Sequence, residues 1–406
     1  MRLHATRRAA IAQARGLGNP LWDLAGVPAS LDLRFAESKS LVDAVSGQNL
    51  ITFTRASDGA VVNSAGQIEI VAANVPRFTH DPVTLESLGL LVEEQRTNLL
   101  LRSEEFDNAS WTLFGTASRS ANATNAPNGS LTADSVTLPV AAGIYQLVSA
   151  SASTSYTFSL WIRADSAQTV RLVINTNLSD PSVLTVTATT AWQRFSITKT
   201  TSAGTTSVTA QLDTGGGNTF YIWGAQLEVG AFPTSYIPTT ATAVTRSADV
   251  ASITGANFSS WYRQDEGTVF AECAVALPAS GGNQFVFRAS DNGFNNNTTI
   301  NIQGGGFASM ATAAGGVFDG AAASVLALTA NVNQRFAGGY AIDNLGVSLS
   351  GGVVAVDTSA TMPTTLNRLD IGSDHISTNR VRAGTIRRLT YWPARLSNGV
   401  LQTLTQ

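Results

Sequence analysis

Residues 87–111, SLGLLVEEQRTNLLLRSEEFDNASW, decide how the chain is organised. The stretch joins a turn-rich amino-terminal part to a long series of strands rich in Thr, Ser and Val, and it holds the densest run of paired leucines and charges. Glu93, Glu94 and Arg96 stand beside these leucines, with no histidine, cysteine or phosphate-binding loop near them. The stretch therefore predicts a docking hinge rather than a catalytic site.

The charges of this hinge are interpreted as an exposed, ion-paired surface. Exposed ion pairs contribute only about 0 to 1 kcal/mol each, so this hypothesis expects Glu93→Gln to be nearly silent. The leucines are expected to matter more. Replacing Leu99 or Leu101 by Asp is expected to uncouple or unfold the junction.

The composition indicates a sheet protein with few salt-bridged helices. The 406 residues are 44% hydrophobic and 13% charged, and the usual charged fraction is about 25%. The net charge is −3 and no concentrated basic face is visible, so nucleic acid is not an expected partner. No apolar run approaches the roughly 18 residues that cross a bilayer, so no membrane insertion is expected.

Alternation of apolar and polar residues with a period of two predicts strands along most of the chain. Residues 156–163, YTFSLWIR, show the pattern clearly. Other predicted strands are 31–35, 51–55, 68–71, 170–175, 183–188, 192–198, 207–212, 219–223, 268–277, 284–288, 299–303, 335–342, 346–349, 366–371 and 385–392. Turn residues separate them at spacings that favour a sandwich or barrel over helical crossovers, so the expected fold class is all-β.

Four regions are expected in order along the chain. They are a basic, helical amino-terminal anchor (1–28), a β-meander that ends in the docking hinge (29–102), a first β-sandwich (103–243) and a second β-sandwich in tandem with it (244–406). Pro233 and Pro238 predict an extended linker near residues 231–248. Ser397 is expected to cap a short last helix that runs through Leu401 and Leu404.

The residues that usually carry catalysis are sparse. His4, His80 and His375 are far apart and show no metal-ligand spacing, and His80 is expected to bond a backbone carbonyl in a turn. The carboxylate pattern E-x-D-x-x-E of jelly-roll glycosidases is absent. The single cysteine, Cys273, lies on the apolar face of a predicted strand and is expected to be a buried hydrophobe. An enzyme is therefore not expected, and neither is a cofactor or a metal.

Aromatic residues beside polar ones suggest sugar binding instead. Sugar sites on sandwiches use aromatic platforms together with hydrogen-bonding side chains. Trp161 with Arg163, and Tyr221 with Trp223, share the strand faces opposite the apolar ones, so they are candidate glycan-binding residues. The alternative is that they fill a second packed layer.

A second candidate is the polar loop that begins at Asp291. It combines one aromatic residue, Phe294, with Asn295 and Asn296, which is the composition of a recognition loop. It is also the composition of an ordinary exposed turn, so both interpretations remain open.

Three stretches carry a resemblance to a known family. Residues 89–111, the preceding ANVPRFTHDP (73–82) and the later YIWGAQLEVGAFPTSYIPT (221–239) together resemble tailed-bacteriophage structural proteins of the tail-fibre or head-fibre type. The resemblance covers roughly residues 30–406. It implies that the first sandwich is a jelly roll similar to carbohydrate-binding modules. The segments RFAGGY (335–340) and IRRLTYWPARLSNGVLQTLT (386–405) imply a second sandwich similar to laminin-G or concanavalin-A-like domains.

The resemblance implies a location in the virion. The expected partners are other virion proteins (capsid, portal or tail) and a host-surface glycan, and the expected assembly is a homo-oligomer, with a trimer favoured. Candidate virion-docking residues are Arg2, Arg7, Arg8, Leu99 and Leu101. Two alternatives remain: a capsid decoration or cement protein without a receptor, and a polysaccharide-degrading enzyme with an unrecognised site.

Overall fold

The computed structural model describes residues 21, 25–214, 216, 218–277, 279, 282–375 and 384–406. The described chain is all-β, as predicted, and it forms two compact units, which we call the C-terminal unit and the inserted unit. The C-terminal unit comprises the described residues up to Phe53 together with Ser87–Val92 and Val250–Gln406. The inserted unit comprises Thr54–Glu86 and Glu93–Asp249.

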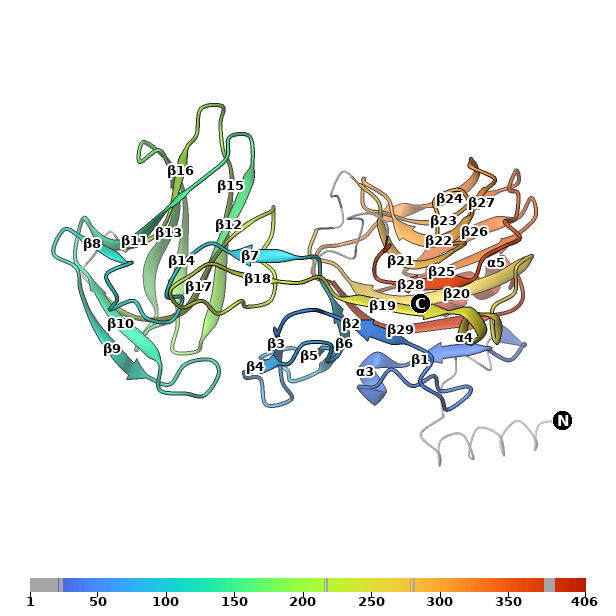
Figure 1. The fold of residues 1–406 in the computed structure, drawn as a ribbon, viewed down its shortest axis with the longest axis horizontal. Helices are drawn as coiled ribbons and strands as arrows, with labels where there is room; N and C mark the ends of the chain where they lie inside the picture. Colours follow the sequence, from blue (N-terminus) through green and yellow to red (C-terminus); the bar gives the residue numbers. More distant parts are fainter. Residues whose placement is uncertain are drawn as a thin grey trace. The chain divides into compact units, whose positions relative to one another are not determined.

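The C-terminal unit is a sandwich of two antiparallel sheets (Figure 1). One sheet contains, in order, β27 (Ala355–Asp357), β26 (Leu345–Leu349), β25 (Gln334–Ala341), β20 (Glu266–Ala274), β29 (Gly384–Trp392) and β6 (Ser87–Val92), and β1 (Leu31–Leu33) also pairs with β29. The other contains β2 (Thr52–Thr54), β19 (Val250–Thr254), β28 (Arg368–Ile371), β21 (Gln284–Ser290), β22 (Asn297–Ile302), β23 (Phe307–Ala314) and β24 (Val317–Ala327). Its short helices are α3 (Phe35–Ser38), α4 (Gly255–Ser259) and α5 (Asn398–Leu404).

The inserted unit contains a second sandwich. Its first sheet, which we call the covered sheet, has the order β15 (Gln193–Thr200), β12 (Ser155–Arg163), β17 (Asn218–Val229), β10 (Ala133–Leu138) and β9 (Ser118–Thr124). Its second, the open sheet, has the order β14 (Asp180–Ala188), β13 (Gln168–Thr176), β16 (Ser207–Thr214), β11 (Ala142–Ser149) and β8 (Thr112–Phe114). Smaller elements are β7 (Arg96–Asn98), which pairs with β18 (Val244–Arg246), the hairpin of β3 (Gly59–Val62) and β4 (Ile68–Val71), and β5 (Phe78–His80).

The alternation of apolar and polar residues along the strands explains the core of the inserted sandwich. The inward residues of both sheets, among them Phe158, Ile162, Leu172 and Phe220, are at most 1% exposed and form one apolar cluster. At about 25 cal/mol per Å² of buried apolar surface, such a cluster is the main stabilising term of a sandwich. Leu100, from the stretch predicted as a hinge, lies in this cluster at 0% exposure.

The order of the regions differs from a tandem arrangement. The stretch 29–102 is not one region, because β1 and β6 pair with β29 near the end of the chain, whereas β3, β4 and β7 belong to the inserted unit. Asp32 of β1 accepts hydrogen bonds from Arg388 Nε at 2.7 Å and from Thr390 Oγ1 at 2.8 Å. Alternation predicts that a strand exists but does not say which sheet it joins. The first sandwich is thus inserted within the second.

The predicted linker at 231–248 is wrong in both halves, because Val244–Arg246 forms β18, which pairs with β7, and Arg246 is 1% exposed. Phe232, Tyr236 and Ile237 are 5%, 2% and 3% exposed, so this segment packs as part of the inserted unit. Asn98 Nδ2 donates to the Ile237 carbonyl at 2.9 Å. Proline and threonine predicted an extended segment correctly, but an extended segment can also lie flat on a sheet.

Several smaller predictions are confirmed. Ser397 caps α5, because its Oγ accepts from the Val400 amide. Cys273 is buried, and burial raises the pKa of its thiol to about 12. His80 Nδ1 lies 3.1 Å from the Val62 carbonyl, although His80 sits in β5 and not in a turn. None of the described helices has the length and apolar character that crossing a membrane requires. Arg2, Arg7 and Arg8, and residues 1–20 and 22–24 of the predicted anchor, lie outside the described residues.

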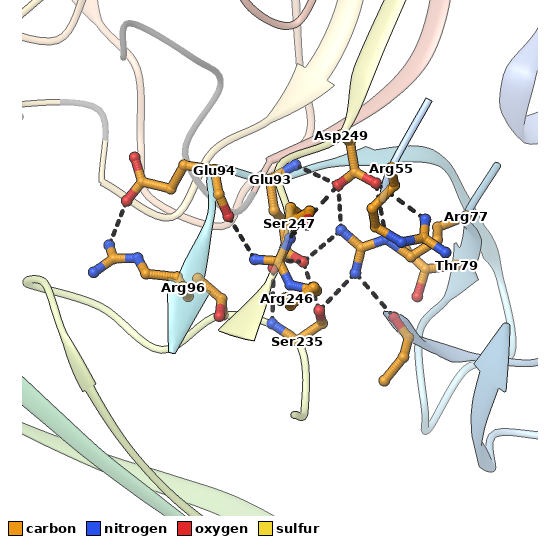
Figure 2. A network of polar contacts seen from close by, with 12 residues as sticks. Arg55, Arg77, Thr79, Glu93, Glu94, Arg96, Ser235, Arg246, Ser247 and Asp249 are labelled. Atoms are coloured by element: carbon orange, nitrogen blue, oxygen red, sulfur yellow. Dashed lines mark hydrogen bonds and ion pairs between the residues drawn. The ribbon is translucent and has the colours of Figure 1, made fainter. Parts of the chain in front are cut away.

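A buried cluster of charges replaces the exposed surface predicted at Glu93 (Figure 2). Glu93 is 1% exposed, and its Oε2 lies 2.7 Å from Arg77 Nη2 and 3.5 Å from Arg246 Nη2. Ser235 also bonds it, through the amide at 2.7 Å. The prediction of a solvated ion pair was wrong, because the local sequence does not show that arginines distant in sequence converge here.

Asp249 is the second carboxylate of this cluster. It is 0% exposed and pairs with Arg77 and, at 3.2 Å, with Arg55 Nη1. Its Oδ2 also accepts from the Glu93 amide at 2.9 Å. We call Arg55, Arg77, Arg246, Glu93 and Asp249 the arginine cluster.

Glu93→Gln is expected to destabilise the protein strongly. Removing one partner of a buried ion pair leaves the other charge uncompensated and costs about 3 to 5 kcal/mol. The matched control is Glu105→Gln, because the Glu105 side chain is 45% exposed and pairs with Arg102 at 2.9 Å. Urea unfolding should show a loss of about 1 kcal/mol or less for the control. Equal losses in the two variants would contradict the cluster's importance.

The same carboxylate predicts a pH dependence. Burial by itself raises the pKa of Glu93, but the guanidinium groups of Arg246 and Arg77 and the bonds from Ser235 lower it to about 2, from 4.5. A lowered pKa contributes stability that is complete above the unfolded-state value and is lost as the pH falls toward 2. The wild type should therefore lose roughly 3 kcal/mol more than Glu93→Gln between about pH 5 and pH 2. Parallel stability curves for the two proteins would exclude this assignment.

Candidate functional site

The outer face of the covered sheet holds two predicted platform residues, and both are buried. Trp161 and Trp223 are 8% and 1% exposed. With Tyr236 they form an aromatic cluster whose ring centroids lie 4.6 to 5.5 Å apart. Gly224 has a φ of +67°, and a Cβ there would lie 2.8 Å from Trp161 Cε3, so glycine allows the rings to pack at this strand irregularity. The alternative of a second packed layer therefore holds for both tryptophans.

The segment after β17 covers the rest of this face. Arg194 Nη1 donates to the Thr234 carbonyl at 2.7 Å, and the Thr234 amide donates to Glu228 Oε1 at 2.9 Å. Gln226 and Glu228, which point outward from β17, are consequently 0% exposed. This face offers little surface to a ligand.

Arg163 and Tyr221 remain partly exposed at one end of the covered sheet. The Arg163 guanidinium carbon lies 4.4 Å from the centroid of the Tyr221 ring and 5.8 Å from that of Trp192. Tyr221 donates to Asp165 at 3.1 Å, and this bond raises the pKa of the phenol. The structure brings Arg163 and Tyr221 together, but the guanidinium occupies the ring face that a sugar would need.

The predicted recognition loop uses most of its polar groups internally. Asp291 accepts from the Gly293 amide at 2.9 Å and from Asn296 Nδ2 at 2.7 Å. The Asn295 carbonyl accepts from the Gly316 amide at 2.9 Å. Phe294 is 52% exposed with the Arg288 guanidinium 5.4 Å from its centroid. The loop thus offers the exposed Phe294 ring, and Asp291 and Asn296 hold its shape, whereas Asn295 is exposed and is bonded through its backbone carbonyl.

The predicted docking leucines belong to the inserted sandwich. Leu99 packs against its core, and the Leu99 amide donates to the Leu227 carbonyl at 2.8 Å. The Leu101 amide donates to Gln146 Oε1 at 2.7 Å. The segment that contains both leucines is therefore bonded to the inserted sandwich.

The outer face of the open sheet carries a set of exposed side chains that the sequence alone did not single out. Strand register aligns its outward residues in rows. The first row is Phe114, Gly143, Asp213, Arg171 and Thr185, the second is Thr112, Tyr145, Gln211, Val173 and Val183, and the third is Leu147, Thr209, Asn175 and Pro181. Leu147 and Val183 are both 49% exposed, so this face reaches solvent, although Val173 and Thr209 in the same rows are only 3% and 1% exposed.

Two aromatic rings lie at one side of this face. A Cβ at Gly143 would lie 2.5 Å from Phe114 Cε1, which shows that the Phe114 ring lies across the glycine. The ring centroids of Phe114 and Tyr145 are 6.1 Å apart, and both side chains are partly exposed. Glycine in β11 therefore makes room for the Phe114 ring, which with the Tyr145 ring, tilted by 52° to it, forms an apolar platform.

A hydrogen-bonded polar group lies beside the rings. Arg171 Nε donates to Asp213 Oδ1 at 2.6 Å, and Gln211 Nε2 donates to Asp213 Oδ2 at 2.6 Å. The side chain of Asp213 is 8% exposed, whereas that of Arg171 is 43% exposed. The buried carboxylate holds the guanidinium and the amide in fixed positions, which reduces the entropy that a ligand must overcome.

This arrangement has the two parts of a sugar site. Aromatic faces contact the apolar side of a pyranose ring, and oriented amides and guanidinium groups bond its hydroxyls. The residues come from four strands, so the sequence placed them on alternating faces without showing that they are neighbours. The alternation in YQL (145–147) and VRLVIN (170–175) is the sequence signal that could have identified them. In each segment, every second residue points outward, and these outward residues include polar or aromatic ones.

A pocket of about 280 Å³ also lies in the inserted unit. Its lining is mainly apolar and includes Ile70, Ile237 and Val244, with Arg246 among the polar members. Arg246 is held by Glu93 and by the Glu94 carbonyl at 2.7 Å. The pocket thus adjoins the arginine cluster, whose contacts are structural. Within the described ranges, no group of three or more His, Cys, Asp or Glu residues is arranged to hold a metal.

The comparisons with known proteins give likenesses to solved structures alone. No protein-family model matches the sequence, and a search of curated proteins finds no match. Three similar structures are a CBM4 (TM-score 0.25, 18% identity, 32% of this chain and 92% of that chain), the Ruminococcus gnavus IT-sialidase CBM40 bound to α2,3 sialyllactose (0.30, 17%, 35% and 83%) and the enzymatically active domain of bacteriophage CBA120 tailspike protein 4 (0.27, 11%, 33% and 21%). At these TM-scores the likenesses carry no argument about function. The sandwich assignment rests on the sheets themselves.

Buried and exposed aromatic residues should respond differently to truncation. Trp223→Ala is expected to lower the free energy of unfolding by about 3 to 5 kcal/mol, because it opens a cavity in the packed cluster. Tyr145→Ala is expected to cost about 1 kcal/mol or less, as a partly exposed side chain. Chemical denaturation of both variants measures the difference. A larger loss of unfolding free energy for Tyr145→Ala than for Trp223→Ala would show that the outer face of the open sheet is covered.

Proposed function

We propose that the inserted unit binds carbohydrate on the outer face of the open sheet. The observation that carries the proposal is the placement of the Phe114 and Tyr145 rings beside Gln211, Asp213 and Arg171 on one exposed sheet face. Rings supply contact with the apolar side of a sugar, and the polar group supplies directed hydrogen bonds. The sheet holds both parts rigidly, so little conformational entropy is lost when a ligand binds.

The proposed activity is recognition without hydrolysis. Glycoside hydrolysis needs two carboxyl groups about 5 to 9.5 Å apart. Asp213 is the one carboxylate at the outward positions of the described strands of the open sheet, and both of its oxygens are bonded to neighbours. A catalytic role would require Asp213 to leave these partners.

The proposed setting is a virion, as a component of a tail or head fibre. This part of the proposal rests on the motifs at 73–82, 89–111 and 221–239. In that setting the amino-terminal part attaches to other virion proteins, and an oligomer, with a trimer favoured, displays the sandwiches toward a host-surface glycan. Proteomics of purified particles checks the location, and absence of the chain from particles would exclude it.

Sugar binding should depend on Tyr145. The full chain is tested on a glycan array, and the strongest ligand is then titrated by calorimetry. Tyr145→Ala is expected to weaken binding at least about tenfold, which corresponds to about 1.4 kcal/mol. The matched control is Phe294→Ala, which removes another exposed ring, from the C-terminal unit, and is expected to bind as the wild type does.

Three outcomes would contradict the proposal. Binding that survives Tyr145→Ala but is lost in Phe294→Ala would move the site to the loop at 291–296. Silence of the wild type against the whole array and against host cells would favour a decoration or cement protein. Release of reducing sugar from a bound polysaccharide would indicate the hydrolytic alternative.

A further inference from the structure

Arg171 differs from Asp213, its partner on the open sheet, because some of its hydrogen-bonding groups have no partner in the described part of the chain. Its Nε is bonded to Asp213, while its two terminal amino groups have no hydrogen-bond partner among the described residues. The side chain is 43% exposed, so these amino groups are accessible. Asp213, in contrast, is fully engaged by Arg171 and Gln211.

The geometry of a guanidinium group decides what such an arginine recognises. Its planar fork donates two parallel hydrogen bonds to a carboxylate, and charge-assisted bonds of this kind are about twice as strong as neutral ones. Asp213 fixes the plane of the fork through Nε, so the group is oriented before a ligand arrives. A lysine at this position would give the same charge but no fork.

The spacing on the sheet matches a linked sugar. Arg171 on β13 and Gly143 on β11 are separated by one strand, β16, and they lie in the same row. Neighbouring strands are about 4.8 Å apart, so the backbones at Arg171 and Gly143 lie roughly 10 Å apart, and the guanidinium group reaches from β13 toward Asp213 between them. Two joined sugar rings cover such a span, with one ring on the aromatic platform and the acidic group of the next at Arg171.

We propose that the open sheet selects glycans that carry a carboxylate, with Arg171 as the residue that determines this specificity. The inference rests on the proposed function, since it assigns a class of ligand to the same site. Seen from far away, the opposite charges of Arg171 and Asp213 cancel. The preference for acidic glycans therefore arises from direct contact and not from long-range attraction.

The test compares ligands that differ in the acidic group. The full chain is titrated with a galacturonic-acid trisaccharide and with its carboxyl-reduced form, and in a second pair with sialyllactose and lactose. The acidic member of at least one pair is expected to bind roughly tenfold to a hundredfold more tightly, the usual effect of a charge-assisted hydrogen bond. Arg171→Gln is expected to abolish the preference, because it should weaken the binding of the acidic member much more than that of the neutral member.

Arg171→Lys separates loss of specificity from loss of structure. It keeps a positive charge beside Asp213, so the sheet should keep its unfolding midpoint, but it lacks the bidentate fork and should retain only part of the preference. The selectivity is refuted, and general sugar binding retained, if acidic and neutral members bind equally or if Arg171→Gln keeps the preference. The selectivity is also refuted if the protein binds neutral ligands of the array through Tyr145 but binds neither member of either pair. Silence against every glycan refutes the proposed function as well.

Discussion

The arginine cluster is the constraint on which the inserted unit depends. It brings together residues 55, 77, 93 and 246–249, which are remote in sequence, around two carboxylates with no access to solvent. Burying a charge is expensive unless it is paired and hydrogen-bonded, so each segment can take its place only when the others are present. This requirement fixes the hairpin of β3 and β4, the start of β7 and the end of β18 relative to one another inside the unit. It also ends the sandwich at Asp249, from which the chain continues into β19.

The same packing explains why one outer face of the sandwich is closed. The segment after β17 must reach Glu93 through Ser235 and Glu228 through Thr234, so it lies along the covered sheet. Trp161 and Trp223 are then enclosed with Tyr236. A β-sandwich has two outer faces, and covering one leaves the other for recognition. The exposed side chains of β11, β13 and β16 follow from this asymmetry.

Alternation in the sequence was sufficient to predict the fold class and most strands, because parity is a local property of a strand. The YTFSLWIR strand and the Ser397 cap are examples in which neighbouring residues carry all of the information. The environment of Glu93 was not predictable in this way. A glutamate next to leucines has the same local pattern whether it faces water or two distant arginines, here Arg77 and Arg246. Trp161 and Trp223 were likewise predicted on the correct face, but nothing in their own strands indicates that residues 231–239 cover it.

The open sheet shows why a binding face is harder to find than a core. Core residues can be predicted because apolar residues recur at every second position of a strand. No such pattern marks the residues of the proposed site within their own strands: Phe114, Tyr145, Gln211 and Arg171. Their chemistry appears only when register sets Phe114 across Gly143 and Arg171 beside Asp213. The two kinds of arginine in this unit make the contrast plain. Arg77 is buried, has both carboxylates of the arginine cluster as partners and stabilises the fold. Arg171 has one carboxylate, uses one nitrogen to hold it and keeps its remaining donors in solvent, which is the condition under which an arginine recognises a ligand.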